Sequence, residues 1–294
     1  MKKSARLVFF GTDSFSVPIL EALVNANWSV VAVVTRPDSK AGRNQATSIP
    51  PVKTLAQKHR LEILQPTNLS EIIYKIAGLE PSHGILASYG KLVPQSLIDL
   101  FPGGIINVHP SLLPRWRGAT PIETAILSGD EETGVSLMKL SIGMDEGPVY
   151  AQKRVVLTGE ETTPQLRDQL AEIGANLLNE KLPDIVAGKL SPSPQNDIKA
   201  TYTKLLAKAD GAIDWSQPAD IYERQIRAYL LYPKSSAEIS GQRTVITKAR
   251  VAKNAEDGSL VMTCNPGYLE VLELIAPSGR RISGIDFSRG YKNR

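Results

Sequence analysis

Five short apolar runs alternate with helix-like segments along the first two-thirds of the chain, and this alternation limits the fold more than any other feature. The runs are rich in valine, isoleucine and phenylalanine and are bounded by turn residues, as strands are. They span 7–10, 30–35, 84–87, 105–108 and 135–140, with helix-like segments at 16–26, 52–59, 69–77 and 121–128. Wholly apolar strands that alternate with helices indicate a mostly parallel α/β sheet covered on both faces.

A change of composition separates this region from the rest of the chain. Thr163 can cap a helix that carries one apolar stripe over about 164–182. The stretch 188–196 is rich in proline, serine and glycine, which predicts a linker. Beyond it, one helix-like segment at 220–230 and several short strand-like pieces separated by turns indicate a small barrel.

The composition excludes several classes of protein. The 294 residues are 42% hydrophobic and 22% charged, which is ordinary globular usage and enough for about two domains. A single cysteine, Cys264, permits no intrachain disulfide, and three histidines are too few for a Cys/His metal cluster. No apolar stretch has the length of a membrane span or a signal-peptide core, so we expect a soluble cytoplasmic protein. The net charge of +4 permits an anionic partner without requiring one.

The turn at residues 10–14 lies between the first predicted strand and the first predicted helix. Its single glycine, Gly11, does not make the Gly-x-Gly-x-x-Gly pattern, so a dinucleotide site is only weakly supported. Helix N-termini do bind anions, so a phosphate-bearing substrate could approach this turn. The alternative is an ordinary tight turn that caps the helix.

Asn107 and His109 lie two residues apart at the end of an apolar strand, so their side chains share one face. Pro110 ends that strand, and ligands of open parallel sheets bind beyond the carboxyl ends of the strands. Asp145 follows another predicted strand, so we expect its loop to open at the same sheet edge. A carboxylate beside an imidazole fixes the tautomer of a histidine that acts near neutral pH. Each residue taken alone also fits a purely structural role.

Several motifs in one order resemble the folate-dependent formyltransferases. The matching stretches are NVHPSLLP at 107–114, WRG at 116–118, SYG at 88–90, FGT at 10–12 and GMDEG at 143–147. Other stretches resemble the methionyl-tRNA formyltransferases within that family, namely VTRPD at 34–38, AGR at 41–43, ATY at 200–202, IDW at 213–215 and IRA at 226–228. The resemblance extends over about residues 5–275.

The resemblance implies a domain organisation and a reaction. It implies a Rossmann-like catalytic domain over 1–187, a linker over 188–207 and an OB-like, tRNA-binding β-barrel over 208–294. It implies 10-formyltetrahydrofolate as the formyl donor and the α-amino group of initiator methionyl-tRNA as the acceptor, for translation initiation. It implies no metal and no membrane, and we expect a monomer.

The resemblance also assigns individual residues. It assigns catalysis to Asn107, His109 and Asp145. It assigns folate contacts to Ser111, Leu112, Leu113, Pro114, Tyr89 and Gly90, and tRNA contacts to Arg43, Arg36 and Lys40. The amide of Asn107 or a protonated His109 can donate to the oxyanion of a tetrahedral intermediate, whereas a neutral His109 can take the proton of the amine. The sequence leaves both roles of the histidine open.

Two departures from the family pattern bear on tRNA binding. The family usually has further basic residues where this chain has Asn44-Gln45-Ala46, and it often has Pro-Trp-Pro where this chain has Leu231-Tyr232-Pro233. Fewer charges predict weaker and less salt-sensitive binding of a nucleic acid.

Other functions remain as alternatives. One is a formyltransferase that acts on a nucleotide-linked amino sugar, and another is a non-catalytic nucleic-acid-binding protein with a formyltransferase-like domain. A glycinamide ribonucleotide formyltransferase lacks the second domain, and the missing glycines after Gly11 disfavour an oxidoreductase. A basic face on the barrel and the charges over 36–53 would favour tRNA over a sugar.

Overall fold

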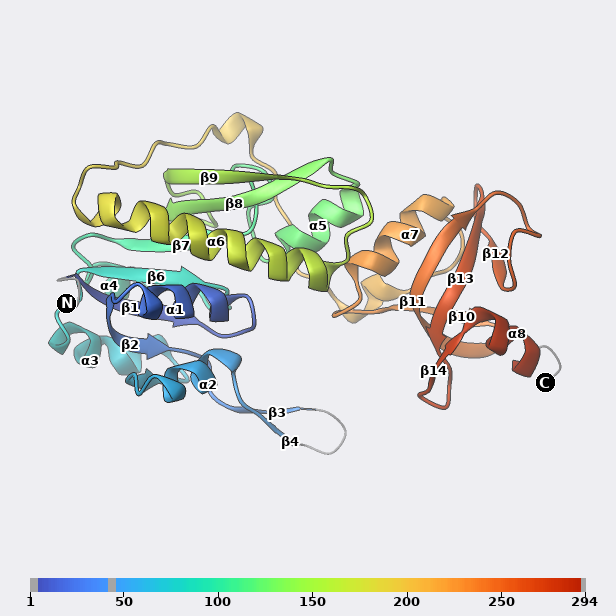
Figure 1. Ribbon diagram of the computed structural model, residues 1–294, viewed down its shortest axis with the longest axis horizontal. Coiled ribbons are helices and arrows are strands. Elements are labelled where there is room, and N and C mark those ends of the chain that lie inside the picture. Colours follow the sequence, from blue (N-terminus) through green and yellow to red (C-terminus); the bar gives the residue numbers. More distant parts are fainter. Residues whose placement is uncertain (1–4, 42–45, 292–294) are drawn as a thin grey trace. The chain divides into compact units, whose positions relative to one another are not determined.

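The computed structural model describes residues 5–41 and 46–291 (Figure 1). These residues form two compact units. The first comprises the described residues up to Ala119 with Thr133–Val155 and Arg167–Tyr202, and the second comprises Thr120–Glu132, Val156–Leu166 and the described residues from Thr203 onward. Arg43, predicted to contact tRNA, lies outside the described residues. No described helix is long and apolar enough to cross a membrane.

A seven-stranded sheet forms the centre of the first unit, in the order β5-β2-β1-β6-β7-β8-β9 (Figure 1). Its strands are β1 (Arg6–Gly11), β2 (Ser29–Val34), β5 (Ile63–Leu64), β6 (His83–Ala87), β7 (Ile105–His109), β8 (Glu132–Lys139) and β9 (Val149–Val156). The strands from β5 to β7 pair in parallel, as the apolar runs predict. The apolar pattern does not predict β9, because most of that strand is exposed or half-buried and carries polar residues.

The last two strands depart from the parallel arrangement. β8 pairs antiparallel with β7, so that His109 lies opposite Ser136, and Lys139 at the end of β8 lies opposite Ile106. The Lys139 N–H donates to the Pro148 carbonyl, which starts the return of the chain along β8. The loop after β8 therefore leaves the sheet where β7 begins, and the expectation that β8 ends at the same edge as His109 is wrong. A wholly apolar run has the same pattern in a parallel and in an antiparallel strand, so the sequence does not predict that β8 is antiparallel to β7.

Helices cover both faces of this sheet. They are α1 (Ser16–Asn25), α2 (Pro51–Lys58), α3 (Ile73–Gly78), α4 (Gln95–Ile98) and α6 (Thr163–Val186), with a 3₁₀ turn η1 (Leu69–Ile72). The strands β3 (Ser39–Ala41) and β4 (Ala46–Ser48) form a separate two-stranded sheet. On one face, Gly174 of α6 packs against Val108 of β7 and Ile19 of α1. On the other face, Phe10 of β1 packs edge-on against Phe101 in a cluster that includes residues of η1, α3 and α4.

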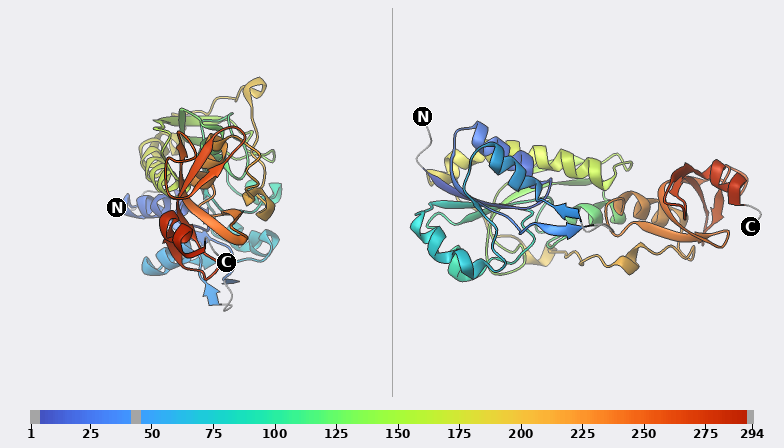
Figure 2. Two further views of the ribbon diagram at one scale, coloured as in Figure 1. Left: turned by 90° about the vertical axis from the view of Figure 1, so that its right-hand side faces the viewer. Right: turned by 90° about the horizontal axis from the view of Figure 1, so that it is seen from below.

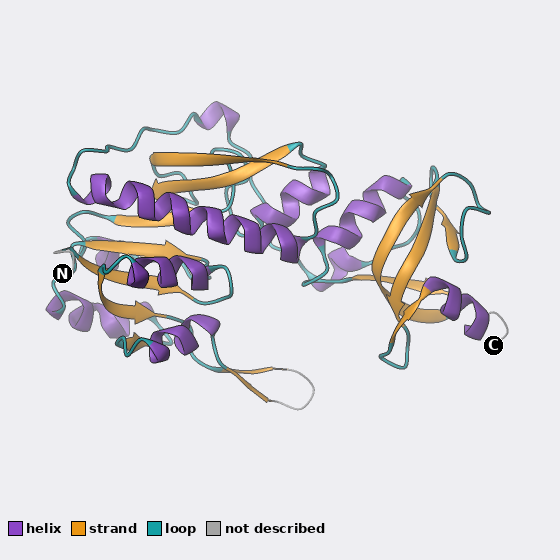
Figure 3. Ribbon diagram, in the orientation of Figure 1, coloured by secondary structure: helices purple, strands orange, loops and turns teal. Residues whose placement is uncertain are grey.

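A curled antiparallel sheet forms the centre of the second unit (Figures 2 and 3). It has the order β10 (Ser235–Ile239), β11 (Gln242–Ala252), β13 (Tyr268–Ile275) and β12 (Val261–Thr263), with β14 (Arg281–Ser283) also beside β13. The helices of this unit are α5 (Pro121–Ser128), α7 (Ala219–Ala228) and α8 (Gly284–Tyr291), with the start of α6. Buried Tyr222 and Ile226 of α7 share one core with Leu269 of β13 and Phe287 of α8. This core gives the second unit its own hydrophobic centre.

Candidate active site

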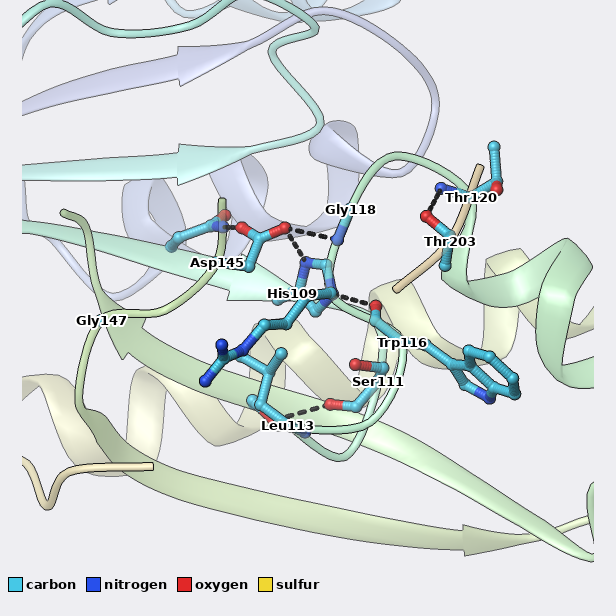
Figure 4. A network of polar contacts seen from close by, with 12 residues as sticks. His109, Ser111, Leu113, Trp116, Gly118, Thr120, Asp145, Gly147 and Thr203 are labelled. Atoms are coloured by element: carbon cyan, nitrogen blue, oxygen red, sulfur yellow. Dashed lines mark hydrogen bonds and ion pairs between the residues drawn. The ribbon is translucent and has the colours of Figure 1, made fainter. Parts of the chain in front are cut away.

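Three polar side chains meet at the carboxyl end of β7 (Figure 4). Asn107 and His109 come from β7 itself, and each is only 5% exposed. Asp145, from the loop between β8 and β9, accepts a hydrogen bond from the Asn107 amide at 3.3 Å through Oδ1. Its Oδ2 accepts from the Gly118 backbone N–H at 2.9 Å and lies 3.7 Å from His109 Nδ1. The structure therefore brings together the three side chains that the sequence places in one candidate site.

The loop over 140–147 folds back along β7 to bring Asp145 to His109. It starts at Leu140, whose N–H donates to the Ile105 carbonyl at the beginning of β7. Asp145 itself has a left-handed backbone, with φ of 52°. Gly147 lies against the Lys139 carbonyl, where an added Cβ would stand 1.8 Å from the oxygen. The loop can take this path only because residue 147 has no side chain.

The hydrogen bonds of His109 define which of its nitrogens carries a proton. Nε2 lies 3.1 Å from the backbone carbonyl oxygen of Trp116. A carbonyl oxygen only accepts, so we assign Nε2 as the protonated nitrogen. Nδ1 faces the Asp145 carboxylate at 3.7 Å. In the neutral imidazole the free lone pair is then on Nδ1, and a second proton would lie between Nδ1 and that carboxylate.

The turn over 111–114, predicted to contact folate, is held by side chains of β8 and β9. Ser136 Oγ accepts from the Leu113 N–H at 3.1 Å and donates to the Ser111 carbonyl at 2.6 Å. Gln152 Nε2 donates to the Leu113 carbonyl and to Ser136 Oγ, both at 2.8 Å. The sequence reasoning missed Ser136 and Gln152, because neither belongs to a motif and only the sheet brings them to the turn.

The turn between β1 and α1 is closed by Asp13. One carboxylate oxygen accepts from the Phe15 N–H at 3.0 Å at the start of α1. The other accepts from Ser88 Oγ at 2.6 Å and forms an ion pair with Arg167. An acidic side chain therefore already occupies the N-terminal end of this helix. A phosphate at the same place would meet that negative charge, which favours the interpretation of this turn as a structural cap.

Tyr89 and Gly90, also predicted to contact folate, follow β6. The Tyr89 carbonyl accepts from Thr12 Oγ1 at 2.9 Å, and the ring packs edge-on against Phe10. The ring is 1% exposed, and burial raises the pKa of the Tyr89 hydroxyl to about 12. Gly90 has φ of 77°, a conformation that favours glycine. Tyr89 therefore supports the turn between β1 and α1 from the core, whereas Gly90 is exposed.

A cavity of about 830 Å³ lies beside the loop that carries Asp145. Its walls are α4, residues 99, 101, 102 and 104, Lys139, and most of the loop that follows β8. Ile142, which lines the cavity, is 70% exposed, and Met144, next to Asp145, is 53% exposed. Exposed apolar side chains beside a cavity indicate a binding surface for a partly apolar molecule. The sequence reasoning missed this cavity, since it lies between segments without a shared motif.

Arg36, on the segment that joins β2 to β3, and Lys40, within β3, are predicted to contact tRNA, and both are exposed. Arg36 lines a second cavity of about 420 Å³, which is also lined by residues 12, 13, 37–39, 48–51 and 91. Asp38 in that wall forms an ion pair with Lys53 at 2.7 Å. Hydrogen bonds from Lys53 and Gln65 hold the pKa of Asp38 below its ordinary value. Part of the positive charge of this region is therefore neutralised within the chain.

Basic residues are exposed on β11 of the second unit. Arg243, Lys248 and Arg250 belong to this strand, and Lys253 follows it directly. Arg250 is paired with Glu270 at 2.5 Å. The second unit therefore exposes basic side chains along and next to β11, one of which is neutralised by an ion pair.

Among the residues that the structure describes, no group of three or more His, Cys, Asp or Glu side chains is placed to hold a metal ion. The candidate site consists of an amide, an imidazole and a carboxylate, which can donate hydrogen bonds to an oxyanion and exchange a proton.

Comparison with known proteins defines the family. Residues 5–182 match the family model for formyl transferase, and residues 205–292 match the one for the formyl transferase C-terminal domain. The chain belongs to the formyl transferase family. The candidate site lies within the first matched range, and the curled sheet of the second unit lies within the second.

Relatives of this formyl transferase include proteins named methionyl-tRNA formyltransferase. The one from Chloroflexus aurantiacus is 41% identical, over 97% of this chain and 96% of its own length. The one from Halorhodospira halophila is 39% identical, over 98% of this chain and 97% of its own length. Sequence similarity of this extent includes both units.

Solved structures share the fold at low sequence identity. HypX from Aquifex aeolicus matches with a TM-score of 0.71 and 14% identity, over 98% of this chain and 49% of that one, so this formyl transferase spans about half its length. An N-formyltransferase from Helicobacter canadensis, in complex with folinic acid and dTDP-3-aminofucose, matches with a TM-score of 0.66 and 18% identity, over 96% of both chains. At these identities the likeness concerns the fold alone.

Proposed function

We propose that this chain transfers the formyl group of 10-formyltetrahydrofolate to the α-amino group of the methionine on initiator methionyl-tRNA. Membership of the formyl transferase family supports the chemistry, and about 40% identity to proteins named methionyl-tRNA formyltransferase supports the acceptor. The observation that carries the proposal is the meeting of Asn107, His109 and Asp145 at the end of β7.

The first step joins the two substrates. The lone pair of the amine attacks the formyl carbon, and the electrons of the carbonyl bond move to its oxygen, which becomes an oxyanion. Asn107 donates one N–H to Asp145, and its amide carries a second N–H for this oxyanion. A donor fixed in advance stabilises the charge as it develops, with no need to reorient.

The second step moves one proton and releases the folate. The attacking nitrogen must lose a proton, and the free lone pair of His109 Nδ1 is the base that the hydrogen bond to Trp116 leaves available. The resulting imidazolium is stabilised by Asp145. The oxyanion then re-forms the carbonyl bond, and the bond between N10 of the folate and the formyl carbon breaks with its electron pair left on N10. Return of the proton to N10 gives the formylated amine and tetrahydrofolate. The proposal thus makes His109 a base first and an acid second.

We propose that the folate binds in the 830 Å³ cavity, because part of its wall is the loop that carries Asp145. A partly apolar ring system fits a cavity whose exposed side chains include Ile142. The predicted contacts of the 111–114 turn, Tyr89 and Gly90 stay predictions. In this arrangement Ser136 holds the turn, and Tyr89 lies buried beside Thr12 and Phe10.

We propose a separate role for each part of the chain. Residues 1–187 form the catalytic domain, residues 188–207 form the linker, and residues 208–294 form an OB-like domain that binds tRNA. The enzyme acts as a monomer. Exposed basic residues on β11 support the tRNA-binding role of the last part. Arg36, Lys40 and Arg43 remain the predicted contacts to tRNA, since phosphate contacts supply much of the affinity for nucleic acids.

The experiment that tests the function offers two acceptors to the same enzyme. The purified chain receives 10-formyltetrahydrofolate with either charged initiator tRNA or a nucleotide-linked amino sugar, and the formylated product is measured. We expect formyl-methionine on the tRNA and no formylated sugar. Formylation of the sugar instead would overturn the acceptor, and formylation of neither would overturn the catalytic proposal.

A further inference from the structure

Arg117 is a buried cation, and each of its three guanidinium nitrogens donates a hydrogen bond. Its side chain is 1% exposed. Nε and Nη2 donate to Gln195 Oε1 at 3.1 and 3.0 Å, Nη2 also donates to Asp197 at 2.6 Å, and Nη1 donates to the Tyr202 hydroxyl at 3.0 Å. A buried guanidinium needs such partners, because an unpaired buried charge is strongly unfavourable. All three partners come from the stretch that the sequence predicts as a linker.

Gln195 joins this cation to the loop of the candidate site. While its Oε1 accepts from Arg117, its Nε2 donates to the backbone carbonyls of Asp145 and Gly147, both at 2.7 Å. A side-chain amide offers an acceptor and two donors at one end, which a carboxylate or a hydroxyl does not. The bond to Asp145 holds the backbone of the residue whose carboxylate faces His109.

The same stretch also holds the opposite wall of the site. The Trp116 N–H donates to Thr201 Oγ1 and the Arg117 N–H donates to the Thr201 carbonyl, both at 2.9 Å. The Thr201 N–H donates to the Pro114 carbonyl at 3.2 Å. Trp116 supplies the carbonyl that orients His109 Nε2. Residues 195–202 are thus bonded both to the loop with the carboxylate and to the segment with this carbonyl.

We propose that Gln195, anchored by Arg117, is a positioning residue that sets the distance between Asp145 and His109, an inference that rests on the proposed function. It acts through the backbone of Asp145 and does not touch the reacting atoms. Both Asp145 and Trp116 face His109, so displacement of their common support changes both partners of the imidazole. A displacement of about 1 Å at a catalytic group lowers the rate by about 100-fold.

Two variants separate the role of the donors from the role of the acceptor. Gln195→Ala removes both, whereas Gln195→Glu keeps an acceptor for Arg117 and replaces the donors with an oxygen that repels two carbonyls. We expect both variants to lower kcat by about 100-fold, with KM for folate and for tRNA changed by less than about threefold. Asn196→Ala is the matched control, because this neighbouring exposed amide accepts only from Ile198 within its own turn. It should keep the kcat of the parent chain.

A second measurement needs no substrate. In ¹⁵N-labelled protein the imidazole nitrogens of His109, assigned with His109→Gln, report which nitrogen carries the proton. We expect an Nε2-protonated neutral imidazole in the parent chain and in Asn196→Ala. In Gln195→Ala we expect the signals to move toward an average of the two tautomers. A role in folding alone would lower the unfolding temperature and leave this tautomer signal unchanged.

The outcomes decide between two failures. If Gln195→Glu keeps both the parent kcat and the parent tautomer signal, the positioning role is wrong. The same conclusion follows if kcat falls in all variants only in proportion to the fraction of unfolded protein. If the parent chain formylates no charged tRNA, the proposed function fails, and the tautomer signals alone then decide whether Gln195 positions Asp145 against His109.

Discussion

Two parts of the candidate site are held in place by different means. Asn107 and His109 are residues of β7, where the ladders to β6 and β8 fix the backbone on both sides. Asp145 is a loop residue, and its position depends on separate hydrogen bonds from Gly118, Asn107 and Gln195. The strand would keep the backbone of both residues in place without the loop, whereas the loop needs all its distant partners. Perturbation of the loop should therefore reduce activity without loss of the fold.

The largest effect is expected at the strand. His109→Ala removes the only imidazole of the site and should lower kcat/KM by about 10³-fold, the usual scale for loss of a general acid–base. Steady-state formyl transfer measures this loss, and circular dichroism measures the fold, which should be unchanged. His59→Ala, at the end of α2, is the control and should keep the parent rate. If kcat/KM of His109→Ala is within threefold of the parent value, His109 has no catalytic role.

A smaller loss is expected when the oxyanion donor is removed. Asn107→Ala deletes the amide N–H that the mechanism directs at the developing charge, so kcat should fall by about 10²-fold. KM for both substrates should change little, because the lost contact belongs to the transition state. The measurement is a full kinetic analysis with both substrates varied. A loss found entirely in KM would show that Asn107 binds substrate in the ground state instead.

The loop can be displaced while the strand is left intact. In Gly147→Ala the new Cβ would meet the Lys139 carbonyl oxygen at 1.8 Å, so the backbone next to Asp145 must move. We expect a loss of at least about 10-fold in kcat, with a far-ultraviolet spectrum like that of the parent chain. Gly78→Ala is the control, since no atom lies within 4 Å of its added Cβ. Parent activity in Gly147→Ala would mean that the loop does not need its present path.

The smallest effect is expected at Asp214, a loop carboxylate that has only local partners. Hydrogen bonds from Tyr222 and Ser216 lower its pKa to about 2 from the model-compound value of 3.8. A carboxylate with a lowered pKa stabilises the fold above its unfolded pKa, and this contribution is lost as pH falls through the folded pKa. Asp214→Ala should therefore unfold at a lower temperature than the parent at pH 7.

The pH dependence makes this test specific. The difference in unfolding temperature between Asp214→Ala and the parent chain should shrink as pH falls from about 4 to about 2. Thermal unfolding at several pH values measures it. A difference in unfolding temperature that stays constant over this range would mean that the charge of Asp214 does not contribute to the stability of the fold.

The sequence predicts the strand part of the site better than the loop part. The positions of Asn107 and His109 follow from an apolar run that ends at a proline, because alternation fixes the face and the proline fixes the end. The partners of Asp145 do not follow from any local pattern. Gln195 lies in a stretch whose proline and serine content predicts a linker, and composition does not reveal that its amide binds a buried arginine.

The direction of β8 shows the same limit. The expectation about the sheet edge is wrong, yet Asp145 reaches His109, because the loop over 140–147 turns back along β7. Apolar patterns define which segments are buried and contain no information about direction. The family motif names the three residues that the structure brings together, without the geometry that unites them.

The partner that orients His109 is a backbone carbonyl oxygen, and this limits which mutations can change the orientation of the imidazole. No replacement of the Trp116 side chain can delete that oxygen, so single substitutions there leave the imidazole its acceptor. Insertions or deletions between Pro110 and Gly118 would remove it at once. The orientation of His109 thus depends on the length of the loop between Pro110 and Gly118 more than on the identity of its side chains. Among related proteins, the length of this loop should therefore predict the orientation better than the residue at position 116.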